Sequence, residues 1–239
     1  MRSLSLILYL VLTCRPGWAQ PRLEISPLVG DLYVFTTYQR FGALLFPSNG
    51  LYVVAEEGVV MIDMPWDTTQ LQPLLDSIRF RHKKEVLMSV STHWHEDRTG
   101  GVKFFRSKGI RTYSSKKTKE LCLENGVTPP EYSFVTDTTF KVGSHTINIF
   151  YPGHGHTVDN IVVWLEEEQV LYGGCLVKSY EASNLGYIKE ADLESWPEAI
   201  RSLQLKYPNA RHVIPGHEDW KKNRSLERTL KLLKKHSPE

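Results

Sequence analysis

The chain has 239 residues, of which 41% are hydrophobic and 23% are charged. This composition is ordinary for a soluble globular protein, and it excludes a disordered or low-complexity chain. The 29 basic and 27 acidic residues nearly balance, so nothing in the charge indicates binding to nucleic acid or to a membrane surface.

The first 19 residues differ from the rest of the chain and have the pattern of a secretory signal peptide. Arg2 gives a positive start, Leu4 to Leu12 is almost wholly apolar, and Ala19 is a small residue suited to the cleavage site. The apolar run is too short to span a bilayer as a helix. A buried N-terminal strand or a membrane anchor is the alternative, and Cys14 leaves lipid attachment open.

Cleavage after Ala19 would leave residues 20–239, which we expect to form a single domain because no Pro-, Gly- or Ser-rich linker divides them. The segment removed holds two of the 29 basic residues and no acidic residue, so 27 of each sign would remain. We therefore predict an exported, periplasmic protein without net charge when its histidines are neutral.

In the first half of the chain, hydrophobic patterning predicts strands and helices in alternation. A hairpin is expected around the acidic turn Glu56-Glu57-Gly58. Asp67 then opens a helix, with Gln70 as its capping-box partner. In chain order we predict a strand and turn at 22–37, hairpin strands at 51–55 and 59–63, a helix from 67, a strand at 85–92, a short helix at 102–108, a strand at 110–114 and a helix at 116–124.

The second half has a similar plan, with its own hairpin around an acidic turn at 166–169. Ser195 begins a helix, with Glu198 as capping-box partner. We predict a strand at 146–152, hairpin strands at 161–165 and 170–174, a helix at 195–207, a strand at 211–215 and a helix at 225–236. Two such halves favour two sheets packed face to face with helices on both outer faces, an αββα sandwich of the α/β class.

The segment that most clearly carries chemistry is His93-Trp94-His95-Glu96-Asp97, which follows a buried strand directly. Two histidines one residue apart at the end of a strand can turn both imidazoles toward one point, and Asp97 adds a carboxylate. The glycines at 100 and 101 release the backbone into a tight turn. A satisfied polar turn is the alternative, but this spacing of three donors favours a metal site.

Three further segments place donor residues at the ends of strands. Each of these residues alone is more often a turn residue or, for the cysteine, a buried hydrophobe. Together with the first segment they supply imidazole, thiolate and carboxylate, which suit zinc. Six donors are too many for one tetrahedral ion, and they predict two zinc ions that each keep a place for water. The six are His93, His95, Asp97, His156, Cys175 and His217.

These motifs resemble those of the metallo-β-lactamase superfamily over residues 28–230. Many of its hydrolases have a His after the motif's Asp and a bridging Asp, whereas this chain has Arg98 and Cys175 at those positions. Both features resemble the first subclass of class B β-lactamases. The resemblance implies the metallo-β-lactamase fold and a monomer that hydrolyses β-lactam antibiotics (penicillins, cephalosporins, carbapenems) through a metal-bound hydroxide.

The resemblance also implies a role for each residue. His93, His95 and His156 would hold the first zinc, and the second would be held by Asp97, Cys175 and His217. Asp97 would orient the nucleophile, and Arg98 would support the second zinc from outside. Lys178 would pair with the substrate carboxylate, Asn184 would lie near the lactam carbonyl, and residues 40–52 would form a flap.

Other functions stay open from the sequence. The nearest alternative is a thioesterase or lactonase of the same superfamily, against which Arg98, Cys175 and Lys178 argue. A zinc carrier without turnover would lack an open coordination position. A structural zinc domain would favour four closed ligands, often cysteines, and this chain has only three cysteines.

Overall fold

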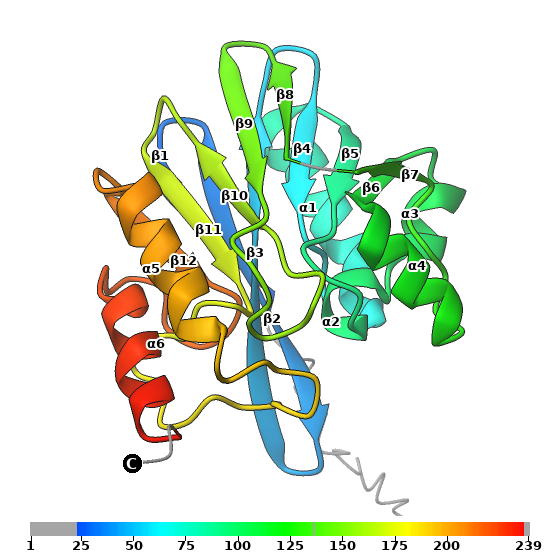
Figure 1. Ribbon diagram of the computed structural model, residues 1–239. Coiled ribbons are helices and arrows are strands. Elements are labelled where there is room, and N and C mark those ends of the chain that lie inside the picture. Colours follow the sequence, from blue (N-terminus) through cyan, green and yellow to red (C-terminus); the bar gives the residue numbers. More distant parts are fainter. Residues whose placement is uncertain (1–22, 136, 237–239) are drawn as a thin grey trace, which may run out of the picture.

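The computed structural model describes residues 23–135 and 137–236, and the predicted signal peptide at residues 1–19, with Cys14, lies outside the described residues. Twelve strands in the described part form two sheets (Figure 1). The first sheet has seven strands in sequence order: β1 (Glu24–Val29), β2 (Leu32–Phe41), β3 (Leu44–Val54), β4 (Val59–Ile62), β5 (Val86–Val90), β6 (Arg111–Ser115) and β7 (Tyr132–Phe134).

The second sheet has five strands in the reverse of their sequence order, from β12 to β8. They are β8 (Thr138–Val142), β9 (His145–Phe150), β10 (Val162–Leu165), β11 (Val170–Gly174) and β12 (His212–Pro215). All pairings in this sheet are antiparallel except that of β11 with β12, which is parallel.

Helices cover the outer face of each sheet. Figure 1 shows α5 and α6 on one side of the molecule, and α1, α3 and α4 on the other. A 3-10 helix, η1 (Thr68–Gln70), precedes α1. The α-helices are α1 (Leu71–His82), α2 (Glu96–Thr99), α3 (Val102–Ser107), α4 (Lys116–Glu124), α5 (Trp196–Lys206) and α6 (Ser225–Lys234). The predicted αββα sandwich is confirmed.

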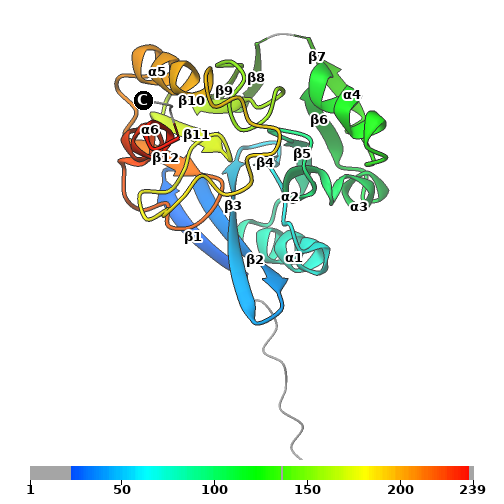
Figure 2. The same cartoon turned by 60° about the horizontal axis from the view of Figure 1, so that its bottom comes forward.

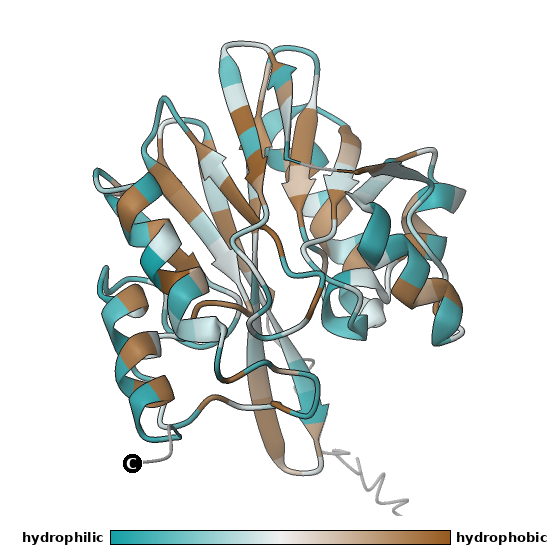
Figure 3. Ribbon diagram, viewed as in Figure 1, coloured by the Kyte–Doolittle hydropathy of each residue, from teal (hydrophilic) through white to brown (hydrophobic). Residues whose placement is uncertain are grey.

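Strand side chains alternate between two environments. Val34, Val60, Val163 and Tyr172 belong to the cluster buried between the sheets, whereas Val162 on the next position of β10 packs outward. Apolar stretches, brown in Figure 3, run through strands of both sheets. Two outer clusters join the sheets to their helices, one through α1 and α3 and the other through α5 and α6. Burial on both faces accounts for the near-continuous apolar runs in the sequence.

The two halves repeat one unit, as the similar hairpins led us to expect. In the first half, the antiparallel β3–β4 pair is followed by α1 and by β5, which lies parallel to β4. In the second half, the β10–β11 pair is followed by α5 and by β12, parallel to β11. A helix on the outer face allows the chain to return to a parallel neighbour.

The predicted capping box at α5 is wrong. The Ser195 hydroxyl donates to the backbone oxygen of His154 at 2.8 Å and does not cap the helix. The side chain of Asp192 instead accepts from the backbone N–H groups of Glu194 and Ser195, both at 3.0 Å. Ser195 is thus used to hold the loop that contains His154, a tertiary contact that the local pattern does not contain.

The helix predicted from Asp67 begins as a 3-10 turn, and the α-helix starts at Leu71. Asp67 accepts from the backbone N–H of Thr69 at 2.9 Å, and Gln70 donates to the Asp67 carboxylate rather than to the backbone. Three short elements, β7, β8 and α2, were not predicted. In the described part of the chain, no helix is long and apolar enough to cross a membrane.

Candidate metal centre

The four motif segments meet at one edge of the sandwich. His93 and His95 follow β5, Asp97 lies in α2, His156 is in the loop after β9, and Cys175 and His217 follow β11 and β12. Figure 2, turned to bring this edge forward, shows the loops that gather there from both sheets. The six predicted donors lie together in two adjacent groups.

The first group consists of three histidines whose ligand atoms all lie within 4.8 Å of one another. His93 Nε2 is 3.1 Å from His95 Nδ1, and the ring of His156 is 5.0 Å from that of His93 and 5.2 Å from that of His95. Burial lowers the pKa of His93 and His156 well below the usual value. Both rings are therefore neutral at pH 7, which is the state that binds a metal.

The second group consists of Asp97, Cys175 and His217. The carboxylate Oδ2 of Asp97 lies 3.1 Å from His217 Nε2, and the Cys175 thiol donates to it at 3.3 Å. Cys175 Sγ and His217 Nε2 are 3.2 Å apart. Asp97 Oδ1 lies 3.7 Å from His93 Nε2, so this carboxylate borders both groups. The soft sulfur, the imidazole and the carboxylate form a donor set that fits zinc.

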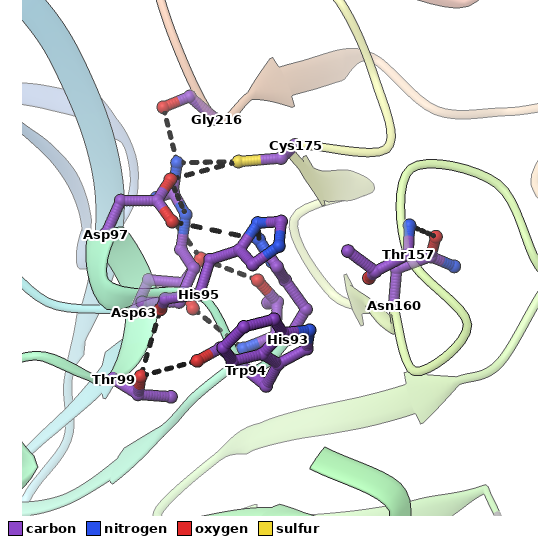
Figure 4. A network of polar contacts seen from close by, with 12 residues as sticks. Asp63, His93, Trp94, His95, Asp97, Thr99, Thr157, Asn160, Cys175 and Gly216 are labelled. Atoms are coloured by element: carbon purple, nitrogen blue, oxygen red, sulfur yellow. Dashed lines mark hydrogen bonds and ion pairs between the residues drawn. The ribbon is translucent and has the colours of Figure 1, made fainter. Parts of the chain in front are cut away.

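Arg98 is fully buried directly behind the second group, where Asp97 and Cys175 lie close to Gly216 (Figure 4). Its guanidinium lies 3.1 Å from Asp97 and donates to Cys175 Sγ at 3.0 Å and to the Gly216 backbone oxygen at 2.9 Å. A Cβ on Gly216 would lie only 2.7 Å from this guanidinium. Glycine at 216 is therefore required for Arg98 to reach across to the second sheet.

The cation of Arg98 sets the protonation state of the group. Burial alone would raise the pKa of Asp97, but Arg98 and the hydrogen bond with His217 outweigh it and hold that pKa well below its usual range. Burial raises the pKa of the Cys175 thiol although Arg98 opposes this. The metal-free centre thus holds a carboxylate and a neutral thiol, and a metal that binds the thiolate displaces its proton.

A second carboxylate lies behind Arg98. Asp63, fully buried at the end of β4, is 3.4 Å from the guanidinium. It accepts hydrogen bonds from the backbone N–H of Thr92 at 2.8 Å, the Thr92 hydroxyl at 2.9 Å and the Tyr172 hydroxyl at 2.8 Å. Asp63 therefore fixes the strand end from which His93 projects, and it pairs with the same cation as Asp97.

Glu190, on the loop between β11 and α5, holds the outer side of the histidine group. Its Oε2 accepts from Trp94 Nε1 at 2.9 Å and lies 3.2 Å from His95 Nε2. The ring of Tyr187 packs edge-on against His95 with centroids 5.4 Å apart. A carboxylate on Nε2 keeps the proton there and leaves Nδ1 of His95 free to face His93.

The centre opens into a cleft of about 820 Å³. His95, Asp97, His156, Cys175 and His217 line its floor. Its aromatic wall includes Phe41, Phe46 and Trp66, of which Phe41 and Phe46 belong to the β2–β3 hairpin that spans the predicted flap. At the hairpin tip, Phe41 is 51% exposed and Leu44 is 61% exposed, so these apolar side chains are not core. A water-accessible cleft with a cluster of donors at its floor is the usual form of an active site.

The two predicted substrate-binding residues also line this cleft. Lys178 is half-buried, and its Nζ lies 5.2 Å from the ring centroid of Trp196. Asn184 is exposed, accepts from the Gly186 N–H at 2.8 Å and donates to the Ser183 hydroxyl at 3.2 Å. In this conformation the Asn184 amide is engaged within its own loop.

Several residues that support the donors were not predicted from the sequence. Asp63 is the last residue of a predicted strand, and attention to polar residues at strand ends, which selected His93, would have found it. Glu190 and Tyr187 have no local pattern, because they reach the centre through a long loop. Cys122 and Cys175 are both free and buried.

Comparison with known proteins gives consistent matches over most of the chain. The Metallo-beta-lactamase superfamily matches residues 44–217. A Metallo-beta-lactamase type 2 of Elizabethkingia meningoseptica is 38% identical over 97% of this chain and 94% of its own length. The Metallo-beta-lactamase IND-1 of Chryseobacterium indologenes is 42% identical over 87% of each chain.

Solved structures of metallo-beta-lactamases also match this chain. A metallo-beta-lactamase from Pontibacter korlensis superposes with a TM-score of 0.86 at 40% identity, over 89% of this chain and 99% of its own. The crystal structure of metallo-beta-lactamase IND-7 also gives a TM-score of 0.86, at 41% identity, over 89% of this chain and 98% of its own.

Proposed function

We propose, from the premise that this chain belongs to the metallo-beta-lactamase superfamily and is a hydrolase, that it opens the amide bond of β-lactam rings with the help of two zinc ions. The observation that carries the proposal is the position of two adjacent donor groups at the floor of one cleft. Penicillins, cephalosporins and carbapenems are the substrate classes. The relatives' names favour this reaction over thioester or lactone hydrolysis.

Each zinc would take three protein donors. His93, His95 and His156 would hold one ion, and Asp97, Cys175 and His217 the other. The neutral buried histidines and the anionic Asp97 suit this assignment. Three donors for each ion leave a position for water, as in catalytic rather than structural sites.

When bound, zinc lowers the pKa of a coordinated water toward roughly 7 and polarises a carbonyl group. The protein residues would do the rest. Asp97, which borders both donor groups, would accept a hydrogen bond from the attacking water and orient it. Arg98 would keep Asp97 anionic for this task. Glu190 would hold His95 in the tautomer that binds metal through Nδ1.

Substrate recognition would fall to the other cleft residues. Lys178 carries a positive charge for the carboxylate that β-lactams share. Asn184 would donate to the lactam carbonyl after its amide leaves Ser183. Phe41 and Leu44, exposed at the hairpin tip, would cover the bound substrate.

Residues 1–19 would direct export and be removed, so that residues 20–239 act as a monomeric domain in the periplasm. The near balance of charge fits a small-molecule substrate rather than a polyanion.

The decisive test is carbapenem hydrolysis by the purified mature protein with a strong chelator and after zinc is added back. We expect the chelator to abolish turnover, zinc to restore it, and metal analysis to give two ions per chain. Bound zinc without opening of any β-lactam would contradict the substrate, and thioesters and lactones would then be assayed.

A paired substitution tests the second zinc. Cys175→Ser should bind about one zinc per chain and lose most of its activity, because the hydroxyl is a poorer ligand than a thiolate. Cys122→Ser is the matched control, since Cys122 is an equally buried thiol in α4 and should keep two zinc ions. Equal zinc content in the two variants would refute the assignment of Cys175.

A further inference from the structure

Two charged residues of the cleft, Glu96 and Glu218, have no part in the proposed mechanism. Glu218 directly follows His217 and lines the cleft. It has a left-handed backbone with a φ of 62°, which is uncommon for a residue other than glycine. Asn49 holds this backbone: its side-chain amide donates to the backbone oxygens of Pro215 at 3.0 Å and Glu218 at 2.9 Å. The direction in which the Glu218 side chain leaves the chain is therefore fixed.

The Glu218 carboxylate is half-buried and has no basic group within 4.0 Å in the part of the chain that the structure describes. The titratable groups that act on it from a distance are His217, Lys178, Arg228 and Glu181. Arg228 is engaged by the backbone oxygen of Ala182. Glu181 is paired with Lys222. The carboxylate thus has a place in the cleft but no cation in contact with it.

Two aromatic rings pack against His217, the residue before Glu218. The ring of Phe46 is 5.1 Å and that of Trp66 is 5.8 Å from the ring of His217, and both line the cleft with Glu218. The two aromatic rings are 6.4 Å apart. Aromatic faces and a carboxylate are the groups that bind an organic cation, especially a quaternary ammonium that cannot be strongly hydrated.

We propose that Glu218, with Phe46 and Trp66, forms a subsite for a cationic substituent, and that the enzyme therefore prefers zwitterionic β-lactams. Lys178 would take the substrate carboxylate while Glu218 takes the cation. In a cephalosporin the carboxylate and the 3-substituent are on neighbouring ring atoms, so both charges reach the same end of the cleft. This inference rests on the proposed function.

A simpler role would be that Glu218 only tunes Lys178, since the two side chains lie in each other's electrostatic field. In that case, removal of the Glu218 carboxylate would change kcat/KM by the same factor for every substrate that carries a carboxylate. A cation subsite predicts different factors for different 3-substituents. The two roles are therefore separated by a ratio of rates and not by any single rate.

The experiment compares two cephalosporins with the same acyl group, one with a quaternary ammonium 3-substituent and one with a neutral 3-substituent. Rates are measured with the zinc-loaded protein for wild type, Glu218→Gln and the control Glu181→Gln, which removes a neighbouring carboxylate outside the cleft. Glu218→Asp retains the charge. Glu218→Gly relieves the left-handed strain and serves if Glu218→Gln folds poorly.

We expect Glu218→Gln to lower kcat/KM for the cationic substrate roughly tenfold, mainly through KM, as the loss of a charge-assisted contact would. The rate for the neutral-substituent substrate should stay the same or rise, and Glu181→Gln should change neither. Equal factors for both substrates, or no effect, would overturn the subsite. If wild type opens neither compound, the proposed function fails instead, so the two failures are distinct.

Discussion

Replacement of Arg98 by methionine tests how far one buried cation organises the centre. The guanidinium is completely buried and contacts two carboxylates, Asp63 and Asp97, in addition to Cys175 and the Gly216 oxygen. Methionine keeps much of the volume and removes the charge. The variant therefore leaves two buried carboxylates without their cation.

The expected loss of stability follows from the hydrogen bonds that each partner of Arg98 retains in the variant. The Gly216 oxygen still accepts from the Asn49 N–H, and Asp63 keeps three donors from Thr92 and Tyr172. Asp97 keeps only His217 and the thiol of Cys175, so it bears most of the loss. Breaking a buried pair by removing one partner costs about 3–5 kcal/mol, and we expect the free energy of unfolding of the metal-free protein to fall by about 3 kcal/mol.

The assay is denaturant unfolding with and without zinc, monitored by near-UV circular dichroism. Zinc at the second site would supply Asp97 with another cation, so the loss should be clearly smaller in the zinc-loaded protein. Arg201→Met is the control, because Arg201 is half-exposed and pairs only with Glu198 on the outside of α5. A loss below about 1 kcal/mol without metal, or equal losses in both forms, would refute this account of Arg98.

Three other predictions follow from the site. Glu190→Gln should weaken zinc binding at the histidine group about 10–100-fold, measured by competition with a chromophoric chelator. The unfolding midpoint of the metal-free protein should not fall. An unchanged zinc affinity would contradict the role of Glu190. Lys178→Met should raise KM for penicillins more than it lowers kcat, and the opposite pattern would point to a role in the chemical step. Acidification from pH 6.5 to 5.5 should destabilise the metal-free protein by up to about 1 kcal/mol for each of His93, His156 and His217, because burial lowers the pKa of these rings and the unfolded chain takes up the protons first. A midpoint that does not move would show that the three rings are not buried neutral.

The elements that carry the donors could be predicted from sequence because their signals are local. His93, Cys175 and His217 each come shortly after a strand of largely buried residues, and such a run has a recognisable length and a clear end. Helices α4 and α6 were found through their periodicity. By contrast, β7 and β8 are short and largely exposed, so they have little hydrophobic pattern to detect.

The supporting residues could not be predicted in the same way, since their function depends on distant partners. Glu190 reaches Trp94 and His95 across about 95 positions of sequence. Ser195 fits a capping box by its spacing, yet its hydroxyl bonds the His154 oxygen. The choice between a local and a distant partner is decided by tertiary packing, and the sequence alone does not contain that packing.

The division of the donors between the two sheets gives the centre a structural consequence. The proposed histidine site takes two ligands from the end of β5 in the first sheet and one from the loop after β9 in the second. The Asp97 site takes one from the first sheet and two from the second, so each zinc would join the two halves. Arg98 makes the same connection without metal, because it extends from the first sheet and donates to Cys175 and Gly216 of the second. The donors are therefore held close together before any ion binds, and little of the binding free energy is spent on ordering them.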